Sequence, residues 1–270
     1  MTASIICLNI QNSKSSWLRL LKVTKIMLVN CFLCVCLLLQ IPGGEPKTDM
    51  YLNIHSHFEK LSKQPRGISK NHEKARLELV KEIVSRYKKD GKVDLILVCT
   101  GNSRRSMMGA AMGNAAATFM GFKNMKFYSG GTKPSAFNSR SITALKAIGF
   151  NIRETGEKAA KGLKGEENPC YEVRWGDDKS CAMVEFSKKY NDPFNPQKDF
   201  IALMVCDEAD MECPSVVGAL ARISLPFADP KEFDGTPLES ARYAERRDDL
   251  GRFMLSTFQL VSEELKKQGH

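Results

Sequence analysis

Apolar residues along this 270-residue chain alternate between short continuous runs and longer segments with helical spacing. A short continuous apolar run predicts a buried parallel strand at residues 95–98, and three further strands are predicted at residues 125–128, 200–205 and 221–225. The helical spacing predicts helices at residues 106–122, 141–148 and 238–265. Strands that alternate with helices are typical of a doubly wound parallel sheet, so we predict an α/β fold with four parallel strands flanked by helices.

Two further helices are predicted before the first strand. Apolar residues recur at helical spacing from Tyr51 to Leu61 and again from Leu77 to Tyr87. The segment 42–49 carries Pro and Gly and separates these helices from the preceding residues. The predicted organisation is therefore an N-terminal extension over 1–49, a helical cover over 50–90 and a catalytic domain over 91–270.

Residues 154–199 of this last domain are rich in Gly, Asn, Pro and charged side chains. We interpret them as an insertion rather than as a separate domain. Tyr171 and Trp175 within it are candidate walls of a substrate entrance, although packing is the commoner role of such aromatic side chains.

The extension contains an apolar run over residues 26–41, broken only by Asn30 and Gln40 and preceded by three basic residues. Such a run is typical of a signal peptide or a short anchor. It is shorter than the about 20 apolar residues that a membrane span needs, and no clear small-residue cleavage site follows it. An overlong start, with Met27 or Met50 as the true first residue, is the preferred interpretation, and a membrane-anchored or exported protein is the alternative.

The nine cysteines do not have the pattern of a disulfide framework, because their number is odd and three of them crowd into the apolar run. Those three are Cys31, Cys34 and Cys36. Five others are expected to be reduced thiols in a cytoplasmic protein: Cys99, Cys170, Cys181, Cys206 and Cys213. Reduced thiols permit nucleophilic and redox chemistry.

The formal net charge of +9 suits an anionic substrate as well as nucleic acid. The first 49 residues contribute +3, from five Lys and Arg against Glu45 and Asp49, which leaves +6 for the rest of the chain. The sequence has no dense basic run interleaved with aromatics and no zinc-finger spacing, so we expect no nucleic-acid partner. The four histidines form no ligand cluster in the sequence: His55, His57, His72 and His270.

The first predicted strand runs directly into Cys99-Thr-Gly-Asn-Ser-Arg-Arg105-Ser106, and a helix is predicted to follow. A loop that opens a helix points several backbone N–H groups at one spot and binds an oxyanion with help from the helix dipole. Gly101 permits the tight backbone that such a loop needs. We therefore predict an oxyanion-binding loop made of Thr100, Gly101, Asn102, Ser103, Arg104 and Ser106 around the reactive pair Cys99 and Arg105.

Each side chain of this loop has an expected role. Positive potential from the N–H groups and the guanidinium favours the thiolate of Cys99, which makes it a nucleophile. Arg105 has a planar fork of donors that can bind two oxygens of a tetrahedral oxyanion. Ser106 is expected to donate a hydrogen bond to the Cys99 sulfur, and Asn102 to hold the loop through its amide.

Two more segments extend this pattern, Ser129-Gly-Gly-Thr-Lys-Pro134 and Asn138-Ser-Arg140. With them, the chain from about Val93 to its last helix resembles the low-molecular-weight protein-tyrosine phosphatase superfamily, which includes thioredoxin-coupled arsenate reductases. The resemblance implies a general acid in an Asp-Pro pair near the C-terminus. Asp229-Pro230 is the best match by position, and Asp192-Pro193 is the competitor.

The segment Cys206-Asp-Glu-Ala-Asp-Met-Glu-Cys213-Pro is similar to the relay segment of those arsenate reductases. The resemblance implies that Cys99 attacks arsenate, that Cys206 resolves the adduct, and that Cys213 completes a disulfide that thioredoxin or another thiol donor reduces. The resemblance thus favours an arsenate reductase with a function in arsenic resistance, with a protein-tyrosine phosphatase that hydrolyses phosphomonoesters as the alternative. A binding-only oxyanion sensor and a zinc site at Cys206 and Cys213 are weaker hypotheses.

Two positions depart from the reductase pattern. Arg104 stands where these reductases commonly have another cysteine, and its charge is expected either to add to anion binding or to be ordinary surface charge. Ala110 stands where some have an acidic residue tied to a potassium site, so we predict no metal and no bound cofactor.

Overall fold

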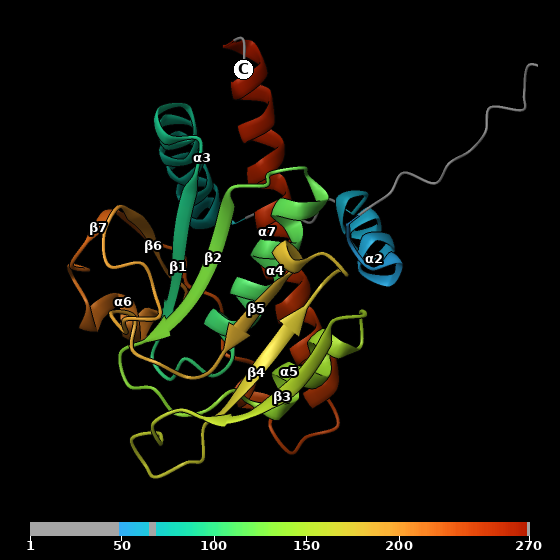
Figure 1. The fold of residues 1–270 in the computed structure, drawn as a ribbon, viewed down its shortest axis with the longest axis vertical. Coiled ribbons are helices and arrows are strands. Elements are labelled where there is room, and N and C mark those ends of the chain that lie inside the picture. The colour runs from blue at the N-terminus through green and yellow to red at the C-terminus, as the bar shows by residue number, and fades with distance from the viewer. Residues whose placement is uncertain (1–48, 65–68, 269–270) are drawn as a thin grey trace, which may run out of the picture. The chain divides into compact units, whose positions relative to one another are not determined.

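The computed structural model of this protein describes residues 49–64 and 69–268 (Figure 1). The apolar run 26–41, the possible start Met27 and His270 lie outside the described residues, as do the three clustered cysteines of the extension. Among the described residues, none of the helices is sufficiently long and apolar for a membrane span.

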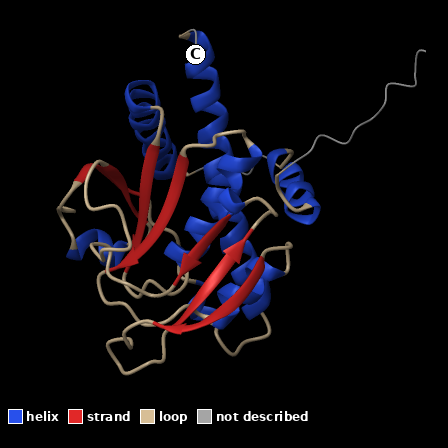
Figure 2. Cartoon of the chain, viewed as in Figure 1, coloured by secondary structure: helices blue, strands red, loops and turns tan. Residues whose placement is uncertain are grey.

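The central sheet has four strands in the order β2-β1-β6-β7, and all neighbouring pairs are parallel (Figure 2). Its strands are β1 (Val93–Cys99), β2 (Met125–Gly131), β6 (Phe200–Met204) and β7 (Ala219–Ser224). Strands β1 and β6 are apolar on both faces because both faces are covered, as continuous apolar runs predict. The predicted parallel four-stranded α/β fold is confirmed.

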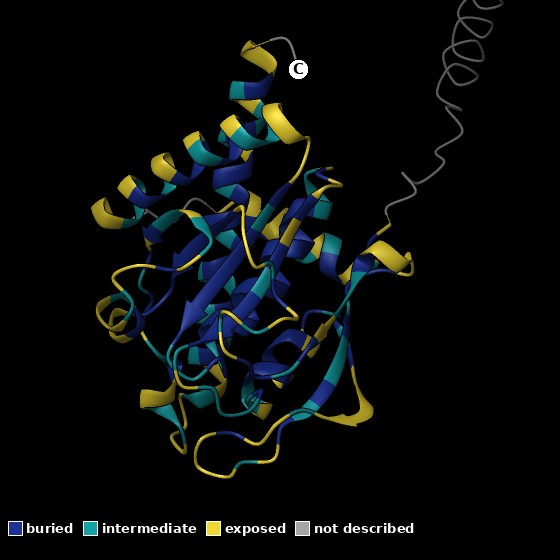
Figure 3. Ribbon diagram, turned by 60° about the vertical axis from the view of Figure 1, so that its left-hand side comes forward, coloured by how far each residue is buried: buried dark blue, intermediate teal, exposed yellow. Residues whose placement is uncertain are grey.

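Helices cover this sheet, and two of them pack closely against each other on one side of it. They are α4 (Arg105–Phe119) and α7 (Glu239–Lys267). Gly109 and Gly113 of α4 lie against the side chains of Leu97 and Phe127, and neither position has room for a Cβ. Because α4 lies between the sheet and α7, it is buried on nearly every side, and this explains its uniformly apolar and small residues (Figure 3).

Two shorter helices follow strands of the central sheet, α5 (Ser139–Lys146) after β2 and α6 (Asp207–Glu212) after β6. The Arg222 side chain ties α6 to β7, with bonds to Asp210 and to the Cys213 carbonyl. Arg222 alternates along β7 with the buried Ile223, so α6 lies on one face of the sheet and Ile223 on the other.

The predicted helical cover consists of α2 (Leu52–Ser62) and α3 (Lys70–Asp90), which both pack on α7. Phe58 of α2 is fully buried. His72 at the start of α3 bonds to the Pro226 carbonyl through Nε2 at 2.8 Å, and His57 of α2 bonds to Asp248 of α7 at 2.9 Å. Both helices belong to the same compact unit as the sheet, Thr48–His270.

The segment interpreted as an insertion contains a second sheet that the sequence did not reveal. Its antiparallel strands are β3 (Asn151–Lys158), β4 (Pro169–Arg174) and β5 (Ala182–Glu185), in the order β3-β4-β5. The first strand begins three residues before the predicted limit of 154. Strand β3 is exposed along most of its length, so it has no apolar alternation from which a strand could be predicted. The described residues also contain two short 3-10 helices, η1 (Lys179–Cys181) and η2 (Pro230–Phe233).

Candidate active site

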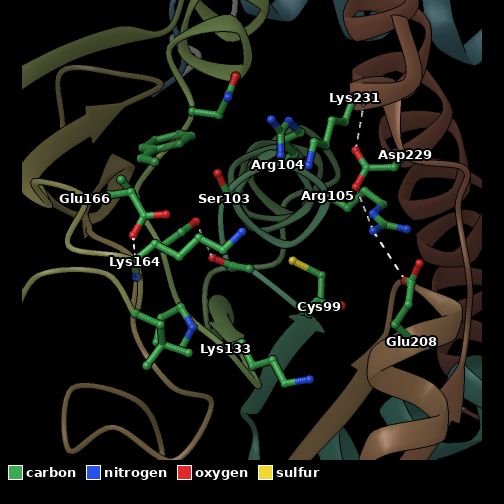
Figure 4. A pocket seen from close by; sticks show the side chains of 18 of the residues that line it. Cys99, Ser103, Arg104, Arg105, Lys133, Lys164, Glu166, Glu208, Asp229 and Lys231 are labelled. Carbon is green, nitrogen blue, oxygen red and sulfur yellow. Dashed lines mark hydrogen bonds and ion pairs between the residues drawn. The ribbon is translucent and has the colours of Figure 1, made fainter. Parts of the chain in front are cut away.

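The predicted oxyanion loop joins the carboxyl end of β1 to the first turn of α4 and opens into a pocket of about 1040 Å³ (Figure 4). Cys99 is the last residue of β1 and Arg105 the first residue of α4. Both residues line the pocket, together with four of the predicted loop residues: Thr100, Gly101, Ser103 and Arg104. Asn102 and Ser106 are fully buried beneath it.

The Cys99 sulfur lies 3.0 Å from the Ser106 hydroxyl. The Asn102 amide nitrogen donates to the same hydroxyl oxygen at 2.9 Å. Because an amide N–H can only donate, the hydroxyl proton of Ser106 stays available for the sulfur. The arrangement therefore suits a Cys99 thiolate, which accepts a hydrogen bond both as nucleophile and as leaving group.

Asn102 has a φ of 40°, in the left-handed region that residues other than Gly seldom occupy. Its side-chain oxygen accepts a hydrogen bond from the Lys188 backbone N–H at 2.8 Å. The Gly101 carbonyl accepts from the Ser187 hydroxyl at 3.1 Å and from the Ser135 hydroxyl at 3.2 Å. The strained loop is thus fixed by residues that are far from it in sequence, and no local sequence pattern identifies them as its partners.

Arg105 is 7% exposed, and its guanidinium has three partners from the C-terminal part of the chain. Nη2 donates to Asp229 Oδ2 at 2.8 Å and lies 3.7 Å from Glu208 Oε2, while Nη1 donates to the Phe227 carbonyl at 3.0 Å. Asp229 lines the pocket, whereas the competitor Asp192 does not. The structure therefore brings the predicted acid and the predicted clamp together on one wall.

Arg104 also lines the pocket, but its guanidinium has partners of its own. Nε donates to the Tyr243 hydroxyl at 2.7 Å, and Nη2 lies 3.3 Å from Asp234. Burial raises the pKa of Tyr243 to about 12. Arg104 is therefore not ordinary surface charge, because it connects the oxyanion loop to α7.

Cys206 follows β6 and is fully buried beside the loop. Its sulfur lies 3.5 Å from the Thr100 hydroxyl and accepts from the Ala209 N–H at 3.4 Å as the N-cap of α6. Cys213 is the C-cap of the same helix and is partly exposed. Desolvation by burial is the main cause that raises the pKa of each of these two thiols.

The comparison with protein families agrees with this geometry. Residues 94–167, which contain the whole oxyanion loop, match the family described as low molecular weight phosphotyrosine protein phosphatase. The predicted resemblance is thereby confirmed, and it holds for the part of the chain that supplies Cys99 and Arg105. A comparison with curated proteins finds no match.

Solved structures similar to this chain include phosphatases and a reductase. A YwlE mutant from Bacillus subtilis is 17% identical, with 65% of this chain and 99% of that chain covered and a TM-score of 0.41. A low molecular weight protein tyrosine phosphatase from T. tengcongensis is 17% identical, with 65% and 99% covered and a TM-score of 0.38. A thioredoxin-dependent arsenate reductase from Corynebacterium glutamicum is 15% identical, with 77% and 85% covered and a TM-score of 0.35. Similarities at this level do not distinguish one activity from another.

The side chains that line the pocket differ from those that the sequence suggested. Trp175 is buried elsewhere, where its Nε1 donates to the Thr118 hydroxyl at 2.8 Å. Tyr171 packs edge to face on Phe137 behind the pocket, with ring centroids 5.7 Å apart. Phe137 itself and the exposed Leu163, from the loop between β3 and β4, form the apolar part of the wall.

Within residues 49–64 and 69–268, no group of three or more His, Cys, Asp and Glu side chains could hold a metal ion. Ala110, at the position of an acidic residue in some reductases, is fully buried in α4.

Proposed function

We propose that this protein is an arsenate reductase in which Cys99, Cys206 and Cys213 act in sequence. The observation that carries the proposal is the position of Cys206, whose sulfur is hydrogen-bonded to Thr100 of the oxyanion loop. A phosphatase needs one thiol at this site, whereas a two-electron reduction needs a second thiol within reach of the first.

The chemistry balances with these three thiols and an external reductant. The Cys99 thiolate attacks arsenic and a hydroxide leaves as water, which gives a covalent thiol–arsenate adduct. Cys206 attacks the Cys99 sulfur, so a Cys99–Cys206 disulfide forms, and the electron pair of the sulfur–arsenic bond stays on arsenic as arsenite departs. Cys213 then attacks Cys206, releases the Cys99 thiolate and leaves a Cys206–Cys213 disulfide. A dithiol protein of the thioredoxin class returns this disulfide to the thiols.

The last exchange requires α6 to unwind. Cys206 and Cys213 are the two caps of this helix, and seven residues of helical rise place them about 10 Å apart. A disulfide requires Cα atoms within about 7 Å. Helix α6 has six residues and is anchored through Arg222, which bonds to Asp210 and to the Cys213 carbonyl. Such a short helix lacks the internal hydrogen bonds that make longer helices stable, so its local unwinding has a low cost.

Phosphomonoester hydrolysis is the second candidate function, and a specific contact favours it. Asp229 lies on the pocket wall beside Arg105, where a general acid can protonate the leaving oxygen of an ester. Both functions use the same oxyanion loop and the same nucleophile. They differ in their need for Cys206 and Cys213.

The test is arsenate-dependent NADPH oxidation coupled to thioredoxin and thioredoxin reductase, with hydrolysis of p-nitrophenyl phosphate measured alongside. We expect Cys206→Ser and Cys213→Ser each to abolish arsenate turnover and to leave ester hydrolysis within about threefold, as the relay chemistry requires. Cys181→Ser is the matched control, because Cys181 is also a buried thiol but lines no part of this pocket. Robust ester hydrolysis without arsenate turnover in the unmodified protein would establish the phosphatase instead.

A further inference from the structure

Five basic side chains line the pocket around Cys99, and they fall into two groups. Three of them have acidic partners: Arg105 bonds to Asp229, Arg104 lies near Asp234, and Lys133 bonds to Glu212 at 2.5 Å. The positive charge of these three groups is already largely compensated before a substrate arrives.

The other two, Lys164 and Lys231, have uncompensated ammonium groups. Neither ammonium has a hydrogen bond or an ion pair with any of the residues that the structure describes; the backbone N–H of Lys164 donates to Glu166, and that of Lys231 donates to Asp229. Lys231 lies two residues after Asp229 and directly before Glu232, so two carboxylates of the pocket flank it in sequence, whereas one, Glu166, is bonded to the backbone of Lys164. Lys164 lies on the opposite wall and reaches into the pocket across from Arg105 (Figure 4).

The loop that carries Lys164 is fixed to the oxyanion loop. The Leu163 N–H donates to the Pro134 carbonyl at 3.1 Å, which holds the tip of the loop at the pocket. At its base, the buried Asn168 side chain donates to the Ala160 carbonyl at 2.9 Å and to the Ser187 carbonyl at 2.7 Å.

Ser187 completes the connection between the two loops. Its backbone N–H donates to the Asn168 side-chain oxygen at 2.9 Å, and its hydroxyl donates to the Gly101 carbonyl at 3.1 Å. The backbone that presents Lys164 is therefore placed relative to Cys99 by hydrogen bonds rather than by flexible contacts. Only the lysine side chain itself has to be ordered when a ligand binds.

We propose that Lys164 is a specificity-determining residue that binds the outer oxygens of a multiply charged oxyanion, opposite the Arg105 clamp. The Arg105 guanidinium lies near two carboxylates, Asp229 and Glu208, and these offset its charge. An incoming dianion therefore meets little net positive charge on that wall. The Lys164 ammonium supplies the missing charge from the other side. The inference rests on the oxyanion site of the proposed function, but it holds for arsenate and for phosphate esters alike.

The experiment measures the dissociation constant of inorganic phosphate for the full-length protein by calorimetry, at low and at high ionic strength. We expect Lys164→Ala to weaken phosphate binding about fivefold at low ionic strength, the upper range of one exposed ion pair, and to weaken it less at high salt. Lys164→Arg should restore most of the affinity. Lys161→Ala is the matched control, because Lys161 lies on the same loop but bonds to Glu167 and does not line the pocket.

Turnover separates a binding role from a structural one. With arsenate or p-nitrophenyl phosphate, Lys164→Ala should raise KM by a similar factor and leave kcat within about twofold, since an exposed ion pair contributes to binding and not to the chemical step. Equal phosphate affinities for Lys164→Ala and Lys161→Ala would overturn the proposal. Phosphate binding that depends on Lys164 in a protein without arsenate turnover would uphold it while the reductase function fails.

Discussion

Arg105 and Asp229 are paired across the pocket wall, with Nη2 of the guanidinium 2.8 Å from Oδ2 of the carboxylate. These bonds to Asp229 and to the Phe227 carbonyl use two of the five guanidinium N–H groups, so three N–H groups remain for an oxyanion. A ligand held by Arg105 would therefore lie next to the Asp229 carboxylate. The pairing couples the position of the candidate general acid to that of the candidate clamp.

This coupling predicts the effect of Asp229→Asn. We expect hydrolysis of p-nitrophenyl phosphate to fall about 100-fold, because the amide cannot protonate the leaving oxygen. Arsenate reduction should change by less than about threefold, since hydroxide that leaves arsenic as water can take its proton from solvent. Steady-state kinetics of both reactions check this, with Asp192→Asn as the control outside the pocket. Equal insensitivity of both reactions would point to another acid.

A second prediction concerns the Ser106 hydroxyl, which bonds to the Cys99 sulfur at 3.0 Å. Ser106→Ala removes a hydrogen bond to a thiolate, a contribution of about 1.5–3 kcal/mol. We expect ester hydrolysis to slow by about 10- to 100-fold, with the covalent phosphocysteine accumulating because its thiolate leaves less readily. Rapid-quench measurement of the intermediate checks this. Ser141→Ala is the control, because Ser141 is equally buried and its hydroxyl has no hydrogen-bond partner in the described structure.

A third prediction follows from the raised pKa of Cys206 and of Cys213, which is due first to burial. Only the thiolate attacks, and a raised pKa lowers the thiolate fraction at neutral pH. The rate of arsenate reduction should therefore keep rising with pH between about pH 7 and 9, toward the raised pKa values. Ester hydrolysis, which needs neither thiol, should not share this rise. Single-turnover rates of both reactions across this range provide the measurement, and parallel profiles would contradict the relay.

The fourth prediction concerns the buried ion pair of Lys188 and Glu185 beneath the loop, with Nζ 3.1 Å from Oε2. These side chains are 2% and 1% exposed, and the Ser129 hydroxyl donates to the same carboxylate oxygen. Lys188→Met leaves an unpaired buried carboxylate, so we expect the free energy of unfolding to fall by about 3–5 kcal/mol. Urea denaturation measures this change.

Two variants control for this interpretation. The double variant Glu185→Leu with Lys188→Met should recover most of the lost stability, because it leaves no uncompensated buried charge. Lys158→Met breaks an exposed pair with Glu167 and should lower the free energy of unfolding much less than Lys188→Met does. A loss in Lys188→Met no larger than in Lys158→Met would show that the buried pair does not stabilise the fold.

The sequence by itself determined the features that depend on residues close together in the chain. Continuous apolar runs predicted the two central strands, β1 and β6, because a strand covered on both faces is apolar at nearly every position. The oxyanion loop was predictable because Cys99, Arg105 and Ser106 lie within eight consecutive residues. A strand, a tight loop and a helix start set the direction of those side chains, and bonds from distant residues then hold the loop in place.

Only the tertiary structure decided which distant residues complete the site. Asp229 bonds to Arg105 although the two residues are 124 positions apart in sequence, and Lys188 bonds to Asn102 at a separation of 86 positions. The exposed strand β3 and the loop that presents Lys164 have no apolar period, so their place on the pocket wall follows from backbone pairing and from the bonds of Ser187 and Asn168. Such contacts depend on how strands and loops from separate parts of the chain pack together, and a pattern of neighbouring residues carries no record of that packing.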